Sequence, residues 1–348
     1  MEKNLPEFIG RKKMSTVRWG VLGTSGIAEK QLLPAFERAS NAKVVAIASQ
    51  SNLAKAKELA STFHIDNIYD SYEKLLADSS IQAIYLPLPN HLHKKWAIKA
   101  AESGKHILCE KPAGLTAEEV KAIQKACEDN QVLFMEGFMY HFHPQHQRVK
   151  ELIASGNVGE VRSMRAAFTF HLTGEKRVNS IKLDRQKGGG SLYDVGCYAI
   201  HSIRNILGQE PESVYTHVQM NTDNDVDEAV HGYLQFSNGL HASFDVSFSA
   251  VNQRVYEVIG TEGLIRAPRA YRPDEYGGEA IVTLEKDKIT QTERLYGDQY
   301  CLEVEHISEA ILSGNTDLKH DFENSIQNMK VMDACFESIQ TGKKAYVN

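Results

Sequence analysis

The stretch Gly20-Val-Leu-Gly23-Thr-Ser-Gly26-Ile-Ala28 decides how the chain is expected to fold. It stands between an apolar run, VRWGVL at 17–22, and a segment whose helical spacing extends from about 26 to 39. Small residues at a strand-to-helix junction allow a tight turn, a close backbone approach and exposed amides at a helix N-terminus. A dinucleotide pyrophosphate needs all three features. We therefore predict a Rossmann-type βαβ unit that begins here.

The turn departs from the usual dinucleotide pattern at one position. Read as G-x-G-x-x-A, the motif has Gly23 and Ala28 in place, but Ser25 takes the position of the middle glycine. A glycine-rich turn without a ligand is the alternative interpretation of such a string. We predict cofactor contacts from every residue of the turn: Gly23, Thr24, Ser25, Gly26, Ile27 and Ala28.

The same alternation of strand and helix continues to about residue 137. Apolar runs suited to buried parallel strands are separated by segments of helical spacing, a pattern typical of a doubly wound parallel sheet. A capping box, Thr116 followed by Glu119, supports the start of the last helix. The predicted strands are 17–22, 43–49, 81–88, 105–110 and 131–136, and the predicted helices are 26–39, 53–63, 90–103 and 116–129.

Beyond Phe138 the pattern changes to longer alternating runs, which indicate a second α/β domain with an antiparallel or mixed sheet. The turn Ser237-Asn238-Gly239 is expected to join two of its strands as a hairpin. We predict a tail at 1–14, a Rossmann domain at 15–137 and a substrate-binding and oligomerisation domain at 138–348. The second domain has predicted strands at 160–172, 213–220, 229–236, 240–248 and 254–260, and predicted helices at 145–154, 298–313 and 324–341, with another after the glycines at 188–190.

Length, charge and cysteine content narrow the class of protein. The 348 residues are enough for two domains, and the formal net charge of −6 gives no basic surface for nucleic acid. The five cysteines form no CxxC pair, which favours reduced thiols in a cytoplasmic protein. No apolar stretch is long enough for a signal peptide or a membrane span, so we expect neither a membrane nor a nucleic acid as partner.

The end of the second predicted strand bears on the choice between NAD and NADP. No acidic residue stands there to bind a ribose 2′-hydroxyl; Ser49, Gln50 and Ser51 take its place, and Lys55 follows one helical turn later. These four residues are expected to contact the cofactor and could receive a 2′-phosphate, while Ser51 could also cap the following helix. The sequence predicts NADP, with NAD as the alternative.

Two further segments follow predicted strands at the edge where open α/β sheets bind ligands. The first is Leu86-Pro87-Leu-Pro89-Asn90-His91-Leu-His93, and the second is Cys109-Glu110-Lys111-Pro112. A lysine at a strand end beside a cleft can have its pKa tuned by burial and neighbouring charge. His91 and His93 lack a third ligand at suitable spacing, so we expect no metal. The expected cofactor contacts are Leu86, Pro87, Asn90, His93, Glu110 and Lys111.

A fourth segment is Gly188-Gly-Gly-Ser-Leu-Tyr-Asp194-Val-Gly-Cys-Tyr198-Ala-Ile-His201. If it is helical, Asp194, Tyr198 and His201 lie on one face. Oxidation of an alcohol beside a nicotinamide requires a general base. A tyrosine next to a lysine can serve, because the ammonium would lower the pKa of the phenol. The alternative is a helix whose tyrosine and histidine only satisfy each other in a domain interface.

Taken in order, GTSGIA, LPNHLH, CEKP, EGFMYHFHPQ, GGGSLYDVGCYAIH and QYCLEVEHISEAI resemble the Gfo/Idh/MocA oxidoreductases from about Val17 onward. The chain is most similar to the branch with NADP-dependent D-xylose dehydrogenases, dimeric dihydrodiol dehydrogenases and glucose-fructose oxidoreductase, which carry tyrosine at the position of Tyr198. The resemblance implies that Lys111 is the catalytic lysine, that Tyr198 gives or takes the proton and that Asp194 positions the substrate.

The resemblance also implies substrate contacts at Tyr140, His141 and His201, and an open sheet in the second domain that forms a homodimer or homotetramer interface. His141 and Gln50 stand where related sequences often have arginine. The expected activity is hydride transfer between NAD(P)(H) and a hydroxyl or carbonyl carbon of a sugar or polyol. A glycosidase of the same fold that recycles bound NAD, and a non-catalytic cofactor-sensing protein, are the two alternatives.

Overall fold

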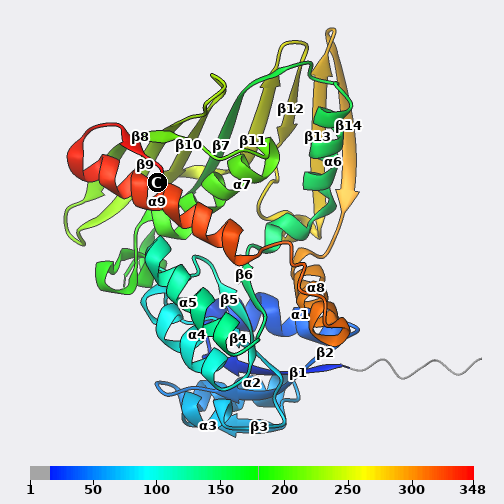
Figure 1. Ribbon diagram of the computed structural model, residues 1–348, viewed down its shortest axis with the longest axis vertical. Helices are drawn as coiled ribbons and strands as arrows, with labels where there is room; N and C mark the ends of the chain where they lie inside the picture. Colours follow the sequence, from blue (N-terminus) through cyan, green and yellow to red (C-terminus); the bar gives the residue numbers. More distant parts are fainter. Residues whose placement is uncertain (1–15, 179) are drawn as a thin grey trace, which may run out of the picture.

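The computed structural model describes residues 16–178 and 180–348, which form two sheets, one above the other in Figure 1. The predicted tail at 1–14 lies outside the described residues. The lower sheet is built from the first part of the chain and the upper one from the second, as the colours of Figure 1 show. The observed α/β class is therefore the predicted one.

The first sheet has six strands in the order β3-β2-β1-β4-β5-β6, and every neighbouring pair is parallel. β1 and β4 are central and nearly free of exposed residues, as parallel strands covered on both faces must be. The strands are β1 Val17–Leu22, β2 Ala42–Ala48, β3 Asn67–Tyr69, β4 Ala83–Leu86, β5 His106–Glu110 and β6 Phe134–Gly137.

Helices cover both faces of this sheet, which confirms the predicted doubly wound arrangement (Figure 1). The predicted N-cap is present, because Thr116 Oγ1 accepts a hydrogen bond from Glu119 N, whereas the Glu119 carboxylate accepts from Leu115 N. The short elements β3 and α3 were not predicted, since three and five residues are too few to show a period. The helices are α1 Leu33–Arg38, α2 Leu53–Thr62, α3 Tyr72–Leu76, α4 His93–Glu102 and α5 Ala117–Asp129.

The second sheet has nine strands in the order β14-β13-β12-β11-β7-β10-β9-β8-β15, and β7 with β10 is its single parallel pair within the described residues. The predicted hairpin between β9 and β10 is present, with Gly239 at φ +81°. The strands are β7 Val161–His171, β8 Ser213–Asn221, β9 Val226–Gln235, β10 His241–Ser247, β11 Ser249–Gly260, β12 Gly263–Ala267, β13 Glu279–Lys286, β14 Ile289–Tyr296 and β15 Ala345–Tyr346.

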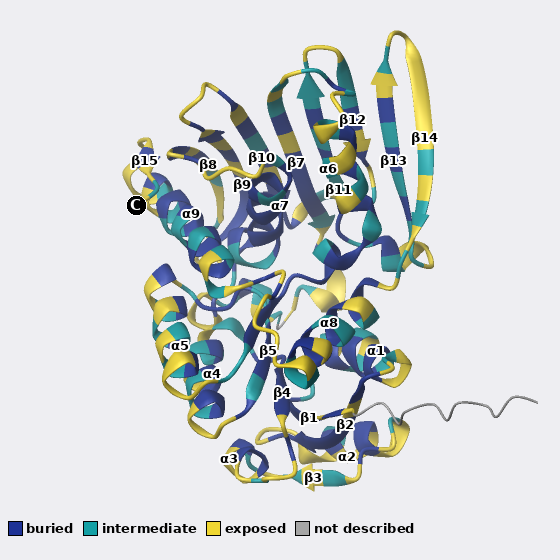
Figure 2. Cartoon of the chain, turned by 45° about the vertical axis from the view of Figure 1, so that its right-hand side comes forward, coloured by how far each residue is buried: buried dark blue, intermediate teal, exposed yellow. Residues whose placement is uncertain are grey.

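The strands β12 to β15 were missed by sequence analysis. β14 is an edge strand whose residues are all at least partly exposed, as its yellow and teal colouring in Figure 2 shows. A solvated edge strand needs no apolar alternation, so the signal on which the prediction relied is absent there.

Four longer helices complete the chain: α6 Pro144–Ala154, α7 Cys197–Leu207, α8 Gln299–Ser313 and α9 Phe322–Thr341. The helices α6, α7 and α9 cover one face of the second sheet (Figure 1). In contrast, α8 returns to the first sheet and packs on α1, where Trp19 Nε1 donates to Ser308 Oγ at 3.2 Å. The predicted division at 137/138 therefore places in the second domain a helix that packs on the first.

The glycine run at 188–190 fixes how α7 begins. The Asp227 carboxylate on β9 accepts hydrogen bonds from Ser191 Oγ at 2.8 Å and Leu192 N at 2.6 Å. Gly190 has φ +116°, and a Cβ there would lie 2.1 Å from Asp227 Oδ1. The two hydrogen bonds hold this buried carboxylate in place, so it cannot move away without losing them. Glycine is therefore required where the chain turns into the helix that carries Tyr198.

We expect Gly190→Ala to destabilise the protein by about 2 to 4 kcal/mol, because it adds a clash with a buried carboxylate to the strain of a positive φ. Gly156→Ala is the matched control. Gly156 also has a positive φ, +73°, but a Cβ there meets no atom within 4 Å. Its expected cost is only about 1 to 2 kcal/mol. Urea denaturation followed by tryptophan fluorescence measures both, and equal costs would contradict the proposed clash.

Candidate active site

A cavity of about 720 Å³ lies where the carboxyl ends of β1, β2, β4 and β5 meet the second domain. This is the edge at which open α/β sheets bind ligands. Residues from both sheets line it. They are Gly23, Thr24, Ser25, Gly26, Ile27, Ser49, Ser51, Tyr72, Pro87, Leu88, Pro89, Asn90, Leu92, Glu110, Lys111, Gly137, Met139, Phe168, Phe170, Ile181, Lys182, Asp194, Val195, Tyr198, Arg254, Arg272, Tyr300 and Glu303.

The first turn forms one end of the cavity with the shape a pyrophosphate requires. Gly23 has φ +119°, and a Cβ there would come within 3.0 Å of the Leu88 side chain. Ser25 Oγ accepts a hydrogen bond from Ala28 N, so the serine in place of a glycine caps the helix that follows. A Cβ at Gly26 would meet no atom within 4 Å, which shows open space beside the backbone. The turn therefore fits a dinucleotide, although Ala28 itself is buried behind the lining.

The residues after β2 divide into those that face the cavity and those that do not. Ser51 lines the cavity, and Ser49 Oγ accepts from Asn52 N at the start of α2. Gln50 and Lys55 are outside the lining: Gln50 donates to Glu73, and the Lys55 ammonium lies 2.6 Å from Glu29 and 2.9 Å from Glu58. Carboxylates bind both side chains in this structure, and their contacts with the cofactor stay a prediction.

The segment after β4 contributes Pro87 and Asn90 to the cavity, whereas Leu86 and His93 are buried beneath it. Asn90 Nδ2 donates to Gly188 O at 2.9 Å across the two domains. The His93 ring lies between two main-chain carbonyls, Leu88 O at 2.7 Å and Pro112 O at 2.8 Å. His93 thus holds together the two loops that carry the cofactor-facing residues instead of contacting a ligand itself.

Lys111 stands at the end of β5 with its ammonium at the contact between the domains. Its Nζ donates to Asp194 O at 2.7 Å and lies 3.5 Å from Asp194 Oδ1. Lys182 binds the same carboxylate, so one acid balances two cations. Burial disfavours the charged form of Lys111, but Asp194 outweighs it, and the pKa of Lys111 is raised. The lysine is therefore a protonated, fixed cation.

Tyr198 on α7 meets Lys111 through its ring. The Lys111 Nζ lies 4.8 Å from the centroid of the Tyr198 ring, and the Tyr198 hydroxyl donates to Met139 Sδ at 3.3 Å. Burial and Glu110 raise the pKa of Tyr198 well above its usual value, and the nearby cation that lowers it is Arg272. The net shift of this pKa is upward, because the buried phenolate would lose its hydration.

Sequence analysis missed several polar side chains that line the cavity: Lys182, Arg254, Arg272, Tyr300 and Glu303. Tyr300 Oη, Glu303 Oε1 and Arg254 Nε are buried without a hydrogen-bond partner among the described residues. Burial and Glu110 raise the pKa of Glu303 well above its usual value. Buried polar atoms without partners are costly, so these atoms are suited to bind polar groups of a ligand. Tyr300 and Glu303 lie in the motif QYCLEVEHISEAI, so the family resemblance pointed to their segment without naming them.

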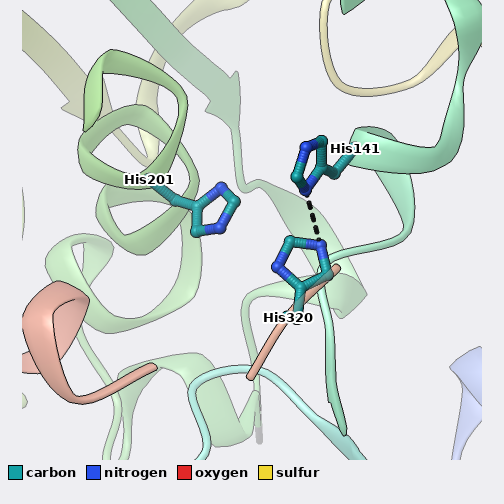
Figure 3. A group of neighbouring side chains, drawn as sticks. All are labelled: His141, His201 and His320. Carbon is teal, nitrogen blue, oxygen red and sulfur yellow. Dashed lines mark hydrogen bonds between the residues drawn. The ribbon is translucent and has the colours of Figure 1, made fainter. Parts of the chain in front are cut away.

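The three residues predicted to contact substrate lie behind the cavity wall. Tyr140 is completely buried, and its hydroxyl is 2.5 Å from His201 Nδ1. His141 bonds His320 at 2.9 Å, with the three histidines grouped as in Figure 3. Met139, next to Tyr140, is the residue of this segment that reaches the cavity. Tyr140, His141 and His201 are not among the residues that line the cavity, and their contacts with substrate stay a prediction.

Comparisons with known proteins agree with this geometry. Residues 17–138 match the family described as "Oxidoreductase family, NAD-binding Rossmann fold", and residues 146–266 match the "GFO/IDH/MocA C-terminal domain". The chain belongs to the Gfo/Idh/MocA family of oxidoreductases, and the resemblance seen in its motifs is confirmed.

Individual relatives match from 74% to 93% of this chain. D-xylose 1-dehydrogenase (NADP(+)) 2 of Haloferax volcanii is 38% identical over 93% of this chain and 98% of its own. Mouse trans-1,2-dihydrobenzene-1,2-diol dehydrogenase is 31% identical over 74% of this chain and 77% of its own. A 3-ketoreductase from Actinomadura kijaniata, solved with NADP and TDP-benzene, superposes with a TM-score of 0.88 at 29% identity, covering 93% of this chain and 98% of its own.

Proposed function

We propose that this oxidoreductase transfers a hydride between NADP(H), with NAD(H) as the alternative, and the hydroxyl or carbonyl carbon of a sugar or related polyol. The observation that carries the proposal is the meeting of Lys111 and Tyr198 in one cavity with the dinucleotide turn. The similarity to a D-xylose dehydrogenase over almost the full length supports a sugar as substrate.

The chain's own residues would hold the cofactor along one side of the cavity. The turn at 23–27 would take the pyrophosphate, and Ser49 and Ser51 would lie near the adenosine ribose. When bound, the nicotinamide supplies the hydride donor or acceptor. No carboxylate stands at 49–51 to repel a 2′-phosphate, and the relative's name specifies NADP, which supports NADP as the first choice.

Tyr198 and Lys111 would handle the proton. The Tyr198 hydroxyl is bonded only to a thioether, a weak acceptor, and can turn to a substrate oxygen at little cost. Lys111, held by Asp194, presents a fixed positive charge that stabilises negative charge on that oxygen. In this scheme Tyr198 and Lys111 are catalytic, and Asp194 positions Lys111.

The remaining polar lining suits a polyhydroxylated substrate. Arg254, Tyr300 and Glu303 present atoms without partners, and Arg272 adds a cation held by Asp274 at 2.8 Å. Neighbouring hydroxyl groups both donate and accept, so they can satisfy a cation, a phenol and a carboxyl at once. We therefore place the sugar between Tyr198 and this group, with aldopentoses as the first compounds to test.

The exposed face of the second sheet supports the proposed homodimer or homotetramer. Tyr215 and Tyr233 are directly paired on β8 and β9 and remain 49% and 47% exposed. Among the described residues, no helix is long and apolar enough to cross a membrane. We propose a cytoplasmic oligomer that associates through this sheet face, with residues 15–137 binding the cofactor and most of 138–348 forming the substrate side.

We expect the protein to reduce NADP⁺ in the presence of an aldose, and Lys111→Met to lower kcat/KM by about 10² to 10⁴-fold through loss of the fixed charge. Absorbance of the reduced nicotinamide, with each cofactor against aldoses, inositols and keto-sugars, measures this. Lys125→Met is the control, because Lys125 is exposed on α5 and paired with Asp129.

Three outcomes would overturn the proposal. Cofactor binding without turnover on the whole panel indicates a sensing protein. Sugar release from chromogenic glycosides without net NAD(P)H change indicates a glycosidase. Unchanged turnover in Lys111→Met removes Lys111 from the chemistry.

A second prediction concerns pH. Because the pKa values of Tyr198 and Lys111 are both raised, their proton-accepting forms are scarce at neutral pH. Alcohol oxidation needs such a form, so its kcat/KM should rise from neutral into alkaline pH, whereas carbonyl reduction should proceed at neutral pH. Profiles in both directions test this, and an oxidation optimum below neutrality would contradict it.

A further inference from the structure

Three histidines from separate parts of the chain meet behind the wall that carries Tyr198. His141 lies in the turn after β6, His201 in α7 and His320 in the connection between α8 and α9. One ring nitrogen of each lies within 4.8 Å of the other two. Figure 3 shows the three rings directed toward a common centre.

The hydrogen bonding of the cluster is incomplete. His201 and His320 are each 1% exposed, yet His201 Nε2 and His320 Nδ1 have no partner within residues 16–178 and 180–348. Leaving a buried ring nitrogen unpaired costs about 1 to 3 kcal/mol. The arrangement therefore lacks a polar partner for these rings, and the unpaired His201 Nε2 is the nitrogen that a ligand shared with His141 and His320 would use.

Tyr140 orients one of the rings. Its hydroxyl contacts His201 Nδ1 at 2.5 Å, which leaves Nε2 as the nitrogen available to a ligand. Metal-binding histidines almost always have their second nitrogen held by such a partner. Phe138 stacks on the same ring at 4.2 Å and fixes its plane. His201 is thus built like a metal ligand with its supporting shell in place.

Each of the three rings can also offer a lone pair to a metal ion. A neutral imidazole always has one free lone pair, so each ring can bind after at most a shift of its proton between nitrogens.

We propose that His141, His201 and His320 form a structural site for a transition-metal ion with strong imidazole affinity, of which Zn²⁺ is the probe. Zn–N bonds of about 2.0 to 2.1 Å place ligand nitrogens roughly 3.3 Å apart in a tetrahedron. His141 Nδ1 and His320 Nε2 are already 2.9 Å apart, so the main movement is the approach of His201. His141 is the least buried of the three rings, so a fourth ligand from solvent would reach the ion on its side.

The surrounding charges restrict which ions can bind. Lys150, Lys319 and Arg204 lie near the cluster, where their positive charges disfavour protonation of its histidines. These groups also repel a divalent cation, so ions that prefer oxygen, such as Mg²⁺ and Ca²⁺, should not bind. Only the stronger bonds of imidazole to Zn²⁺, Co²⁺, Ni²⁺ or Cu²⁺ can offset that repulsion. The ion would tie the α8–α9 connection to α7 and to the end of β6, apart from the hydride-transfer site.

The test is metal content and thermal stability of the full chain. Protein purified with Zn²⁺ in the medium should hold about one zinc per chain by mass spectrometry. Adding Zn²⁺ to chelator-treated protein at about 100 times Kd should raise Tm by about 4 °C. Co²⁺ in its place should give the intense visible absorption of a four-coordinate site.

Four variants make the test specific. His141→Gln and His320→Asn should both lose the zinc and the Tm shift; if the buried His320 variant fails to fold, the more accessible His141 variant still decides. His64→Asn, an exposed loop position, should behave as wild type. The double variant His217→Asn/His231→Asn removes an exposed histidine pair, 6.5 Å apart, that could bind zinc on the sheet surface.

The outcomes are distinct. Zinc retained in the double variant and lost in His141→Gln supports the site. Zinc absent from wild type, retained in His141→Gln, or lost only in the double variant overturns the proposal.

Discussion

The site depends on one buried positive charge, the ammonium of Lys111. A buried ammonium is tolerated only when it is paired and hydrogen-bonded. Lys111 comes from β5 of the first sheet, and both of its partners belong to Asp194, at the start of the α7 segment of the second domain. The pairing therefore fixes the two domains relative to each other at the point where the dinucleotide turn and Tyr198 face the same cavity.

Further polar contacts support this pairing. Lys182 shares the Asp194 carboxylate, and Asp227 holds the backbone just before it. On the cofactor side, His93 joins the loops after β4 and β5 through two carbonyls. The contact of Lys111 with Asp194 joins segments 83 residues apart in the two domains, so the geometry around Lys111 forms only when both domains have folded.

The chemical properties of the site follow from the desolvation of its side chains more than from the charge of Lys111. Burial raises the pKa of Tyr198 and of Glu303 and so favours their neutral forms, while Lys111 stays charged because Asp194 is adjacent. A water-poor cavity with a fixed cation and neutral proton donors favours the binding of a carbonyl or hydroxyl oxygen. Behind it, the histidine cluster contacts Tyr198 indirectly, because Phe138 packs edge-to-face on the Tyr198 ring and stacks on His201.

The sequence by itself determined the class of fold, most of the long elements and the residues at strand ends. Buried parallel strands appear in the sequence as apolar runs. The turn Gly23–Ala28 and Lys111 each follow such a run, and the ends of parallel strands lie at the same edge of the sheet. Lys111 could therefore be placed beside the cofactor from local signals. Edge strands such as β14 gave no such signal.

Only the tertiary structure decided what each side chain faces. Tyr140, His141 and His201 lie outside the cavity lining, and Gln50 and Lys55 are bonded to carboxylates. Arg272 and Tyr300, from distant segments, line the cavity. The cluster of His141, His201 and His320 could not be predicted from the sequence for the same reason. Periodicity reports which face of an element is buried, but the partner across the interface depends on packing between segments far apart in the chain.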